Sequence, residues 1–416
     1  MLSRRDVLRL IPTSSLAWLG ASRFAKAARN APPVAAPLLA GPPVVQLLRI
    51  EGFAVSFALG QLATGWVEWG LSPDRLDQRA IASRAGLVGA SDRAMIVPVS
   101  LGGNTSPGQR IHYRAVAQPL SYETAYKLRR GEPVAGPTYS LTLPDPAAAR
   151  VRIAVINDTH DQPNTLKAVA ARVESVGPEV LVWNGDTPAV AFNTPADPPR
   201  VLLSQGWATT RQLIFVPGNH DFRGAAARDL RDCLAAGPEL SLPYNVAWRY
   251  GPVALLTLDT GEDKPDAHPV FAGTAAYEPY RSRQAAWLRE ALARPDIASA
   301  PFKVAFCHIP LHGLPKQDDG SGLAVTKYAE WSSDGARKWM PALCQAGVQL
   351  VVSGHKHAWR VDEPVKGQPM QVVGGGASRR ETVTVIVLEA DAQSLRVTIQ
   401  DAFSGTELAQ RRLTRS

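Results

Sequence analysis

Residues 151–160 read VRIAVINDTH, and this stretch decides how the second half of the chain folds. The run before Asn157 is apolar except for Arg152, which is the pattern of a strand buried on both faces. Directly after the run come Asp158 and His160, two good metal ligands. In α/β folds, functional sites lie beyond the carboxyl ends of the strands. The stretch therefore predicts a central strand that delivers ligands to a site.

The same pattern recurs along the chain to its C-terminal end. Further apolar runs lie at 181–183, 213–216, 253–256, 304–306, 348–352, 371–373, 383–388 and 395–399. Helical periodicity predicts helices at 165–176, 281–293 and 334–346. Strands that alternate with helices predict an α/β domain with central sheets over residues 150–416.

Five of the predicted strands end in polar loops that carry metal-ligand side chains. These loops are Asn157–His160, Asn184–Asp186, Gly218–Asp221, Cys307–Pro310 and Gly354–His357. Seven of their side chains are candidate metal ligands: Asp158, His160, Asp186, Asn219, His308, His355 and His357. A mixed set of carboxylate, amide and imidazole groups suits Mn, Fe or Zn rather than Cu(I).

The order DxH, GD, GNHD, H, GHxH in these loops resembles the calcineurin-like metallophosphoesterase family, over roughly residues 150–390. The resemblance implies an α+β sandwich of two mixed sheets flanked by helices, and a centre of two divalent or trivalent metal ions. It implies that one ion is held by Asp158, His160 and His357, the other by Asn219, His308 and His355, and that Asp186 bridges them.

The resemblance also implies an activity, the hydrolysis of small-molecule phosphate esters. Two ions lower the pKa of a shared water so that hydroxide exists at neutral pH. His220 would contact the phosphate or protonate the leaving oxygen, and Asp221 would hold His220 or the loop, or serve a structural role. The alternatives are a phosphodiesterase acting on nucleotides or phospholipid head groups, and a non-catalytic metal-binding scaffold.

Two motifs depart from those of the related purple acid phosphatases. The first motif is DxH, with His160, where those enzymes have DxG. In those enzymes a tyrosine follows the GD motif and ligates ferric iron, whereas this sequence reads Gly185-Asp186-Thr187-Pro188-Ala189. Because Ala189 offers no phenolate, we expect a colourless metal centre.

Three long segments are candidates for the rim of the site, at residues 193–200, 261–280 and 314–331. The second segment includes Lys264 and Tyr277. Aromatic rings with occasional basic residues suit a nucleotide or a sugar phosphate, although packing is the commoner use of tyrosine and tryptophan. Both interpretations stay open.

The region from residue 44 to 145 has a different period. Phe53, Val55 and Phe57 alternate with smaller or polar residues, and turn residues separate short runs of this kind. The pattern predicts a small all-β sandwich. The runs at 65–70 and 112–116 resemble strands of the fibronectin-III-like domain that precedes the catalytic domain in purple acid phosphatases. The Ala/Pro-rich residues 28–43 before it are predicted to form a linker.

The first 27 residues are predicted to be a signal peptide. Arg4 and Arg5 precede a moderately apolar stretch, and Ala25-Lys26-Ala27 follows as a cleavage site, which resembles a twin-arginine export signal. The apolar stretch is shorter than a membrane span, so we expect no stable membrane anchor. The resemblance implies twin-arginine export machinery as a partner and a periplasmic or extracellular location. A basic amphipathic helix that stays on the protein is the alternative.

The charge of the chain sharpens this interpretation. Its 416 residues include 45 Lys and Arg against 37 Asp and Glu, a net charge of +8, which invites nucleic-acid or membrane partners. Residues 1–27 contain five basic residues and one acidic residue, so half of the excess lies there. No long basic run with interleaved aromatics follows, and we expect no nucleic-acid partner. The three cysteines lie far apart, which argues against a thiolate metal site.

Overall fold

The computed structural model describes residues 37–103, 105–235, 237, 241–313, 332–365, 367–377 and 382–415. The predicted signal peptide, most of the predicted linker and the rim segment 314–331 lie outside the described residues. Within the described part of the chain, no helix combines the length and the apolar character needed to cross a membrane.

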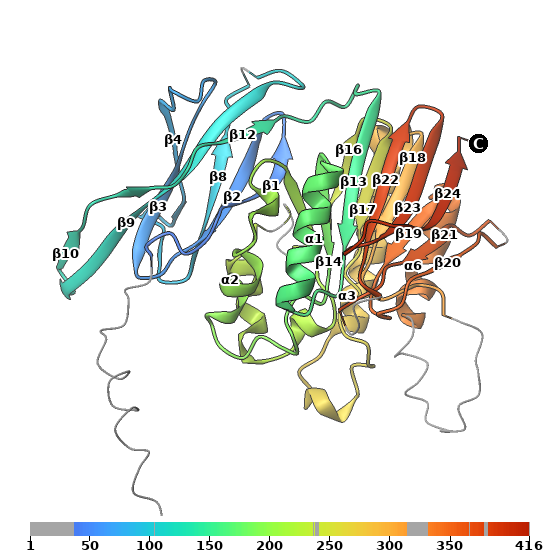
Figure 1. The fold of residues 1–416 in the computed structure, drawn as a ribbon. Coiled ribbons are helices and arrows are strands. Elements are labelled where there is room, and N and C mark those ends of the chain that lie inside the picture. The colour runs from blue at the N-terminus through green and yellow to red at the C-terminus, as the bar shows by residue number, and fades with distance from the viewer. Residues whose placement is uncertain are drawn as a thin grey trace, which may run out of the picture. The chain divides into compact units, whose positions relative to one another are not determined.

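Two mixed β-sheets form the centre of the molecule (Figure 1). The nine-stranded sheet has the order β24-β23-β22-β13-β14-β15-β1-β2-β8, and the six-stranded sheet has the order β16-β17-β18-β19-β21-β20. The strands of the first are β1 (Val44–Arg49), β2 (Gly52–Ala58), β8 (Ala94–Ser100), β13 (Arg150–Ile156), β14 (Val180–Asn184), β15 (Gln212–Val216), β22 (Thr384–Asp391), β23 (Ser394–Asp401) and β24 (Glu407–Thr414). Those of the second are β16 (Ala247–Tyr250), β17 (Val253–Thr257), β18 (Phe302–Phe306), β19 (Leu350–Ser353), β20 (Arg360–Asp362) and β21 (Met370–Val373).

Helices cover the outer faces of these two sheets. The helices are α1 (Pro163–Val176), α2 (Asp197–Leu202), α3 (Tyr277–Ala293), α4 (Pro295–Ala298) and α6 (Ser333–Gln345), with 3₁₀ segments η1 (Gly206–Ala208), η2 (His220–Phe222), η3 (Ala225–Asp232) and η4 (Pro269–Phe271). The predicted α/β class, with two mixed sheets flanked by helices, is therefore confirmed.

The alternation of side chains along each strand explains the layers. In β13, Ile153 and Val155 pack in a core shared with the six-stranded sheet, whereas Ala154 and Ile156 pack in the core beneath α1. A third apolar core joins the other face of the six-stranded sheet to α3 and α6. Strands buried on both faces need apolar residues at every position, which is why these runs were readable in the sequence.

Helix α1 shows how local sequence sets the element boundaries. Pro163 stands in the first turn, where its missing N–H costs nothing. Gly177 ends the helix with a left-handed φ of 58°, and its N–H donates to the carbonyl of Val173 at 2.9 Å. Leu166 and Val169 lie on the buried face of the helix.

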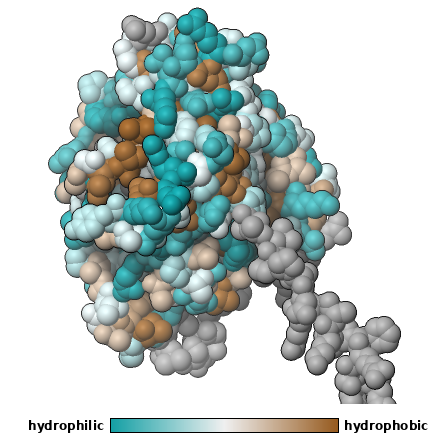
Figure 2. Space-filling model, turned by 90° about the vertical axis from the view of Figure 1, so that its left-hand side faces the viewer, coloured by the Kyte–Doolittle hydropathy of each residue, from teal (hydrophilic) through white to brown (hydrophobic). Residues whose placement is uncertain are grey.

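The N-terminal strands form two layers around a core of their own. One layer is a seven-stranded sheet with the path β10-β9-β3-β4, joined by β7, β11 and β12, and β5 and β6 form a separate hairpin. The strands of the sheet are β3 (Ala63–Gly70), β4 (Gln78–Ile81), β7 (Ala90–Ser91), β9 (Arg110–Thr124), β10 (Lys127–Arg130), β11 (Val134–Ala135) and β12 (Tyr139–Thr142), and those of the hairpin are β5 (Ser83–Arg84) and β6 (Leu87–Val88). Figure 2 shows scattered hydrophobic patches among polar side chains on the face of the molecule that is on the left in Figure 1.

The other layer of this region is not separate from the rest of the protein. Strands β1, β2 and β8 continue the nine-stranded sheet, because β1 pairs in parallel with β15. The Gln212 side-chain oxygen accepts hydrogen bonds from the Leu48 N–H at 2.9 Å and the Tyr250 hydroxyl at 2.5 Å. Leu38, within the predicted linker, is buried in the same core as β1 and β2. The two predicted regions thus share one sheet, and the boundaries drawn from sequence remain predictions.

Tyr113 tests how strongly the outer layer is tied to the rest of the molecule. Its side chain is fully buried, and its hydroxyl donates to the carbonyl of Thr209 at 2.8 Å. Tyr113→Phe should lower the free energy of unfolding by about 1–2 kcal/mol, because the buried carbonyl loses its partner. Urea denaturation measures the change. Tyr122→Phe, at an exposed position, is the matched control, and equal losses in both variants would contradict the interpretation.

Candidate metal centre

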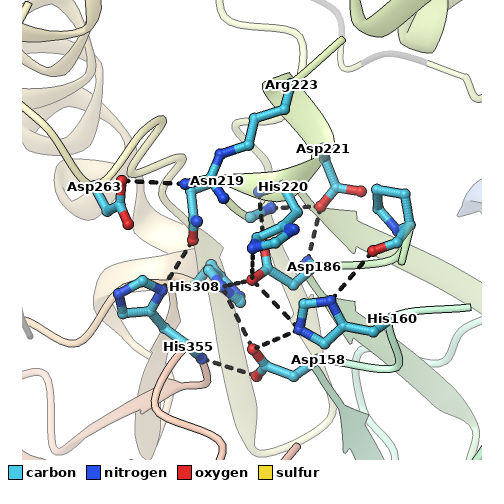
Figure 3. A network of polar contacts seen from close by, with 12 residues as sticks. Asp158, His160, Asp186, Asn219, His220, Asp221, Arg223, Asp263, His308 and His355 are labelled. Atoms are coloured by element: carbon cyan, nitrogen blue, oxygen red, sulfur yellow. Dashed lines mark hydrogen bonds and ion pairs between the residues drawn. The ribbon is translucent and has the colours of Figure 1, made fainter. Parts of the chain in front are cut away.

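The candidate ligands come from both central sheets. The loops after β13, β14 and β15 leave one sheet and those after β18 and β19 leave the other, and all five meet at the carboxyl ends of their strands. Figure 3 shows Asp186 at the centre of this cluster, with Asp158, His160, His308 and His220 around it. Candidate ligands from separate strands thus lie close together in the structure, as the sequence predicts.

Two groups of ligand atoms can each hold an ion. The first comprises Asp158, His160, Asp186 and His357, and the second comprises Asp186, His308 and His355. Within each group the ligand atoms lie within 4.8 Å of one another. The Asn219 side-chain oxygen is 2.9 Å from Nδ1 of His355 and so adjoins the second group. Asp186 belongs to both groups, which is the geometry of a bridging ligand.

Backbone carbonyls orient two of the histidines. His308 Nδ1 lies 2.7 Å from the Asn184 carbonyl, and His160 Nδ1 lies 3.2 Å from the Pro188 carbonyl. A proton on Nδ1 satisfies each carbonyl and leaves Nε2 as a free electron-pair donor. In His160 this atom lies 2.8 Å from Nε2 of His357, so both rings direct a nitrogen to the same point.

The buried carboxylates of Asp158 and Asp186 favour the binding of cations in the cluster. The Asp158 Oδ1 and His308 Nε2 atoms are buried and have no hydrogen-bond partner among the described residues. Their nearest charged neighbours are His357 Nε2 and Asp186 Oδ2, each at 3.3 Å. Burial alone would lower the pKa of His308, but the Asp186 and Asp158 carboxylates raise it to about 10. The carboxylates therefore stabilise a cation at this place. A metal ion at each group would satisfy the orphaned atoms, so the residues fit a dinuclear centre.

The backbone of the ligand loops is strained. A left-handed φ occurs at five of the candidate ligands: Asp158 (48°), His160 (48°), Asp186 (52°), His355 (73°) and His357 (53°). Such angles are uncommon outside glycine and cluster at functional sites. Two glycines permit close approach of these loops: a Cβ at Gly218 would lie 2.4 Å from Asp186 Oδ1, and one at Gly354 would lie 2.5 Å from Asp158 Oδ2.

His220 lies at the edge of the cluster. Its backbone N–H donates to Asp186 Oδ1 at 2.8 Å, and its ring packs edge-on against that of His160. The side chain remains 21% exposed, so a bound molecule can reach it. Burial, assisted by the charge of Arg223, lowers the pKa of His220 to about 4 despite the opposing effect of Asp186.

Asp221 has a different role from one that the sequence suggested, because its carboxylate holds the Asp186 loop and not the ring of His220. It accepts hydrogen bonds from the Asp186 N–H at 2.8 Å, the Gly218 N–H at 2.7 Å and the Thr187 hydroxyl at 2.5 Å. Burial, with the nearby charge of Asp186, raises the pKa of Asp221 to about 7. Asp221 is therefore a positioning residue.

Sequence reasoning missed two contributors. The Asn157 amide donates to Asp158 Oδ2 at 2.6 Å and so fixes that carboxylate. Its place between the strand and Asp158 was the available signal. Arg223 pairs with Glu262 at 2.8 Å, a contact between segments far apart in the chain that no local pattern announces.

Comparison with known proteins identifies the family of this chain and two solved structures with a similar fold. A family model described as calcineurin-like phosphoesterase matches residues 151–359. The structure is similar to that of the purple acid phosphatase PPD1 from yellow lupin (Lupinus luteus) seeds, with a TM-score of 0.66 and 13% identity over 90% of this chain and 75% of that one. It is also similar to the structure of PhoD, with a TM-score of 0.58 and 12% identity over 90% and 88%. At these identities the likeness shows the fold. No curated protein matches the chain.

Asp186→Ala tests the shared carboxylate. Because Asp186 belongs to both ligand groups, its loss should weaken both sites, and the metal content after Mn or Zn loading should fall from about two ions per chain to below one. Elemental analysis after dialysis measures the content. Asp263→Ala, a carboxylate beside the cluster but in neither group, is the control and should keep both ions. Full occupancy in Asp186→Ala would show that the two groups are independent.

Proposed function

Because the chain belongs to the calcineurin-like phosphoesterase family, we propose that this phosphoric ester hydrolase acts on small-molecule phosphate esters outside the cytoplasm. The observation that carries the proposal is the pair of ligand groups that share Asp186. Paired sites of this kind suit an in-line displacement at phosphorus, where charge develops on both the attacking and the leaving oxygen.

The proposed ligand assignment follows the two groups. Asp158, His160 and His357 would hold one ion, Asn219, His308 and His355 would hold the other, and Asp186 would contribute to both. Bound there, Mn, Fe or Zn ions would supply a hydroxide nucleophile and neutralise charge on the phosphoryl oxygens. The neutral Asn219 keeps the site positive toward an anion. Asn157 holds the carboxylate of Asp158, and Asp221 holds the backbone of Asp186.

His220 is proposed to contact the phosphate and to protonate the leaving oxygen. Its backbone is fixed on Asp186 and its ring is accessible at the rim. With a pKa near 4, the ring is neutral before substrate binds. A bound phosphate dianion stabilises the imidazolium, so the acid forms where the leaving oxygen needs it.

Hydrolysis of p-nitrophenyl phosphate by the metal-loaded protein tests the function, and bis(p-nitrophenyl) phosphate tests the diesterase alternative. His220→Ala should reduce kcat about 10²–10⁴-fold with metal content unchanged, the range expected for loss of a general acid. His268→Ala, in the loop after β17 and in neither ligand group, is the control and should keep its activity.

The result also separates the enzyme from a scaffold. Two bound ions without activity on any phosphate monoester or diester would favour the non-catalytic scaffold. An unchanged kcat in His220→Ala would remove the role of that residue but leave the ligand assignment intact.

Export is proposed from the sequence of residues 1–27 alone. The adjacent Arg4 and Arg5 before an apolar stretch support passage through twin-arginine machinery, which carries folded proteins. Replacement of both by lysine should keep the protein in the cytoplasm, as measured by cell fractionation and immunoblotting. The control is Arg23→Lys with Lys26→Arg, which also keeps the charge but lies outside the paired motif. Periplasmic accumulation of the Arg4→Lys/Arg5→Lys variant would refute the proposal.

A further inference from the structure

A cavity of about 740 Å³ lies beside the metal centre. One wall is formed by the segment from Phe222 to Arg231, and the other by residues between Asp259 and Arg283. The second wall includes part of the rim segment 261–280, the yellow part of the chain that projects beyond the carboxyl ends of the strands in Figure 1. The cavity and the metal centre therefore lie at the same end of the sheets.

Arg223 connects the cavity to the centre. It lines the cavity and stands three residues after His220 in the chain. Figure 3 shows Arg223 and Asp263 next to Asn219 and His220. The cavity therefore adjoins residues that flank the metal centre, and none of the seven candidate ligands lines it.

Aromatic rings form much of the cavity wall. The ring of Tyr277 lies 5.6 Å from that of Phe222 and 6.0 Å from that of Phe271, measured between centroids. Tyr244 packs 6.5 Å from Phe222 on the other side. All four residues line the cavity and are only partly buried. Such a wall favours a flat, unsaturated group.

The charges near the metal centre are already paired. Arg223 binds Glu262 at 2.8 Å and Asp263 at 3.2 Å, and Lys264 binds Asp263. Deeper in the cavity, Asp259 is buried and accepts hydrogen bonds from the Gly261 N–H at 2.8 Å and the Tyr280 hydroxyl at 3.1 Å. The charges of Arg223, Lys264, Glu262 and Asp263 thus compensate one another, whereas Asp259 is held by neutral donors.

Three other arginines of the cavity have no such compensation. Arg228, Arg231 and Arg283 are exposed, and none of them pairs with a carboxylate among the residues that the structure describes. Arg283 lies over the ring of Tyr280, with its guanidinium carbon 5.7 Å from the ring centroid. Guanidinium groups above aromatic walls recognise carboxylates or phosphates attached to flat rings.

We propose that this cavity binds the leaving group of the substrate, and that this leaving group is an aromatic alcohol with a negative charge of its own. The rings hold its flat part, and the three uncompensated arginines bind its anionic substituent. The inference rests on the proposed phosphoesterase function and assigns the class of its substrate.

Three phosphate esters test the inference. They are 4-carboxyphenyl phosphate, phenyl phosphate, which lacks the charge, and phosphoglycolate, which lacks the ring. We expect kcat/KM for 4-carboxyphenyl phosphate to exceed each of the others by about tenfold, as one charge-assisted hydrogen bond provides. Arg283→Gln should remove most of the preference, measured as the ratio of kcat/KM for 4-carboxyphenyl phosphate to kcat/KM for phenyl phosphate. Arg289→Gln, an exposed position on the same helix away from the cavity, should keep the preference.

The outcomes distinguish this inference from the function on which it rests. Equal kcat/KM values for the two aryl phosphates, unaltered by Arg283→Gln, would overturn the inference about the cavity. Hydrolysis of phenyl phosphate in the same experiment would still support the proposed phosphoesterase function. Hydrolysis of none of the esters by the metal-loaded protein would overturn the function. In that case, binding of 4-hydroxybenzoate, measured by calorimetry, tests whether the cavity binds a flat anionic ring. Weaker binding by Arg283→Gln than by Arg289→Gln would support this role of the cavity, and equal binding would overturn it.

Discussion

The carboxylate of Asp186 is the group on which the rest of the site depends. It belongs to both sets of ligand atoms, accepts the backbone N–H of His220 at 2.8 Å, and has its own N–H held by Asp221. One side chain thereby couples two metal positions, the proposed acid and a buried support. The loops from two separate sheets must all be placed correctly around it, which accounts for the strained φ angles and the close glycines at the strand ends.

Much of this could be predicted because the informative patterns are local. A doubly buried strand is apolar at every position, and a ligand that follows it stands within four residues, so a short window contains both signals. The seven candidate ligands are indeed brought together by the fold. What the window does not contain is the partner of each strand. The pairing of Val45 with Gln212 joins residues far apart in the chain, and the local sequence around each residue does not indicate its partner.

The same limit explains the details that the sequence left open. Asp221 is adjacent in sequence to His220, which suggested that the two act together, but the carboxylate turns toward Gly218 and Asp186. The left-handed angles at Asp158 and Asp186 follow from how the loops converge and not from residue type. Arg223 and Glu262, which lie between the centre and the neighbouring cavity, meet only because η2 and the end of β17 are neighbours in the folded chain.

The parallel pairing of β1 with β15 has a consequence for synthesis of the chain. Residues 44–49 leave the ribosome long before residues 212–216, their partner in the sheet, have been made. The nascent β1–β2–β8 segment must therefore wait with one edge unpaired, in the state in which strands are most prone to join a neighbouring chain. Conversely, a chain begun near residue 145 would expose β15 as a new apolar edge. By pairing with β15, the N-terminal strands thus cover a sheet edge that could otherwise pair with another chain.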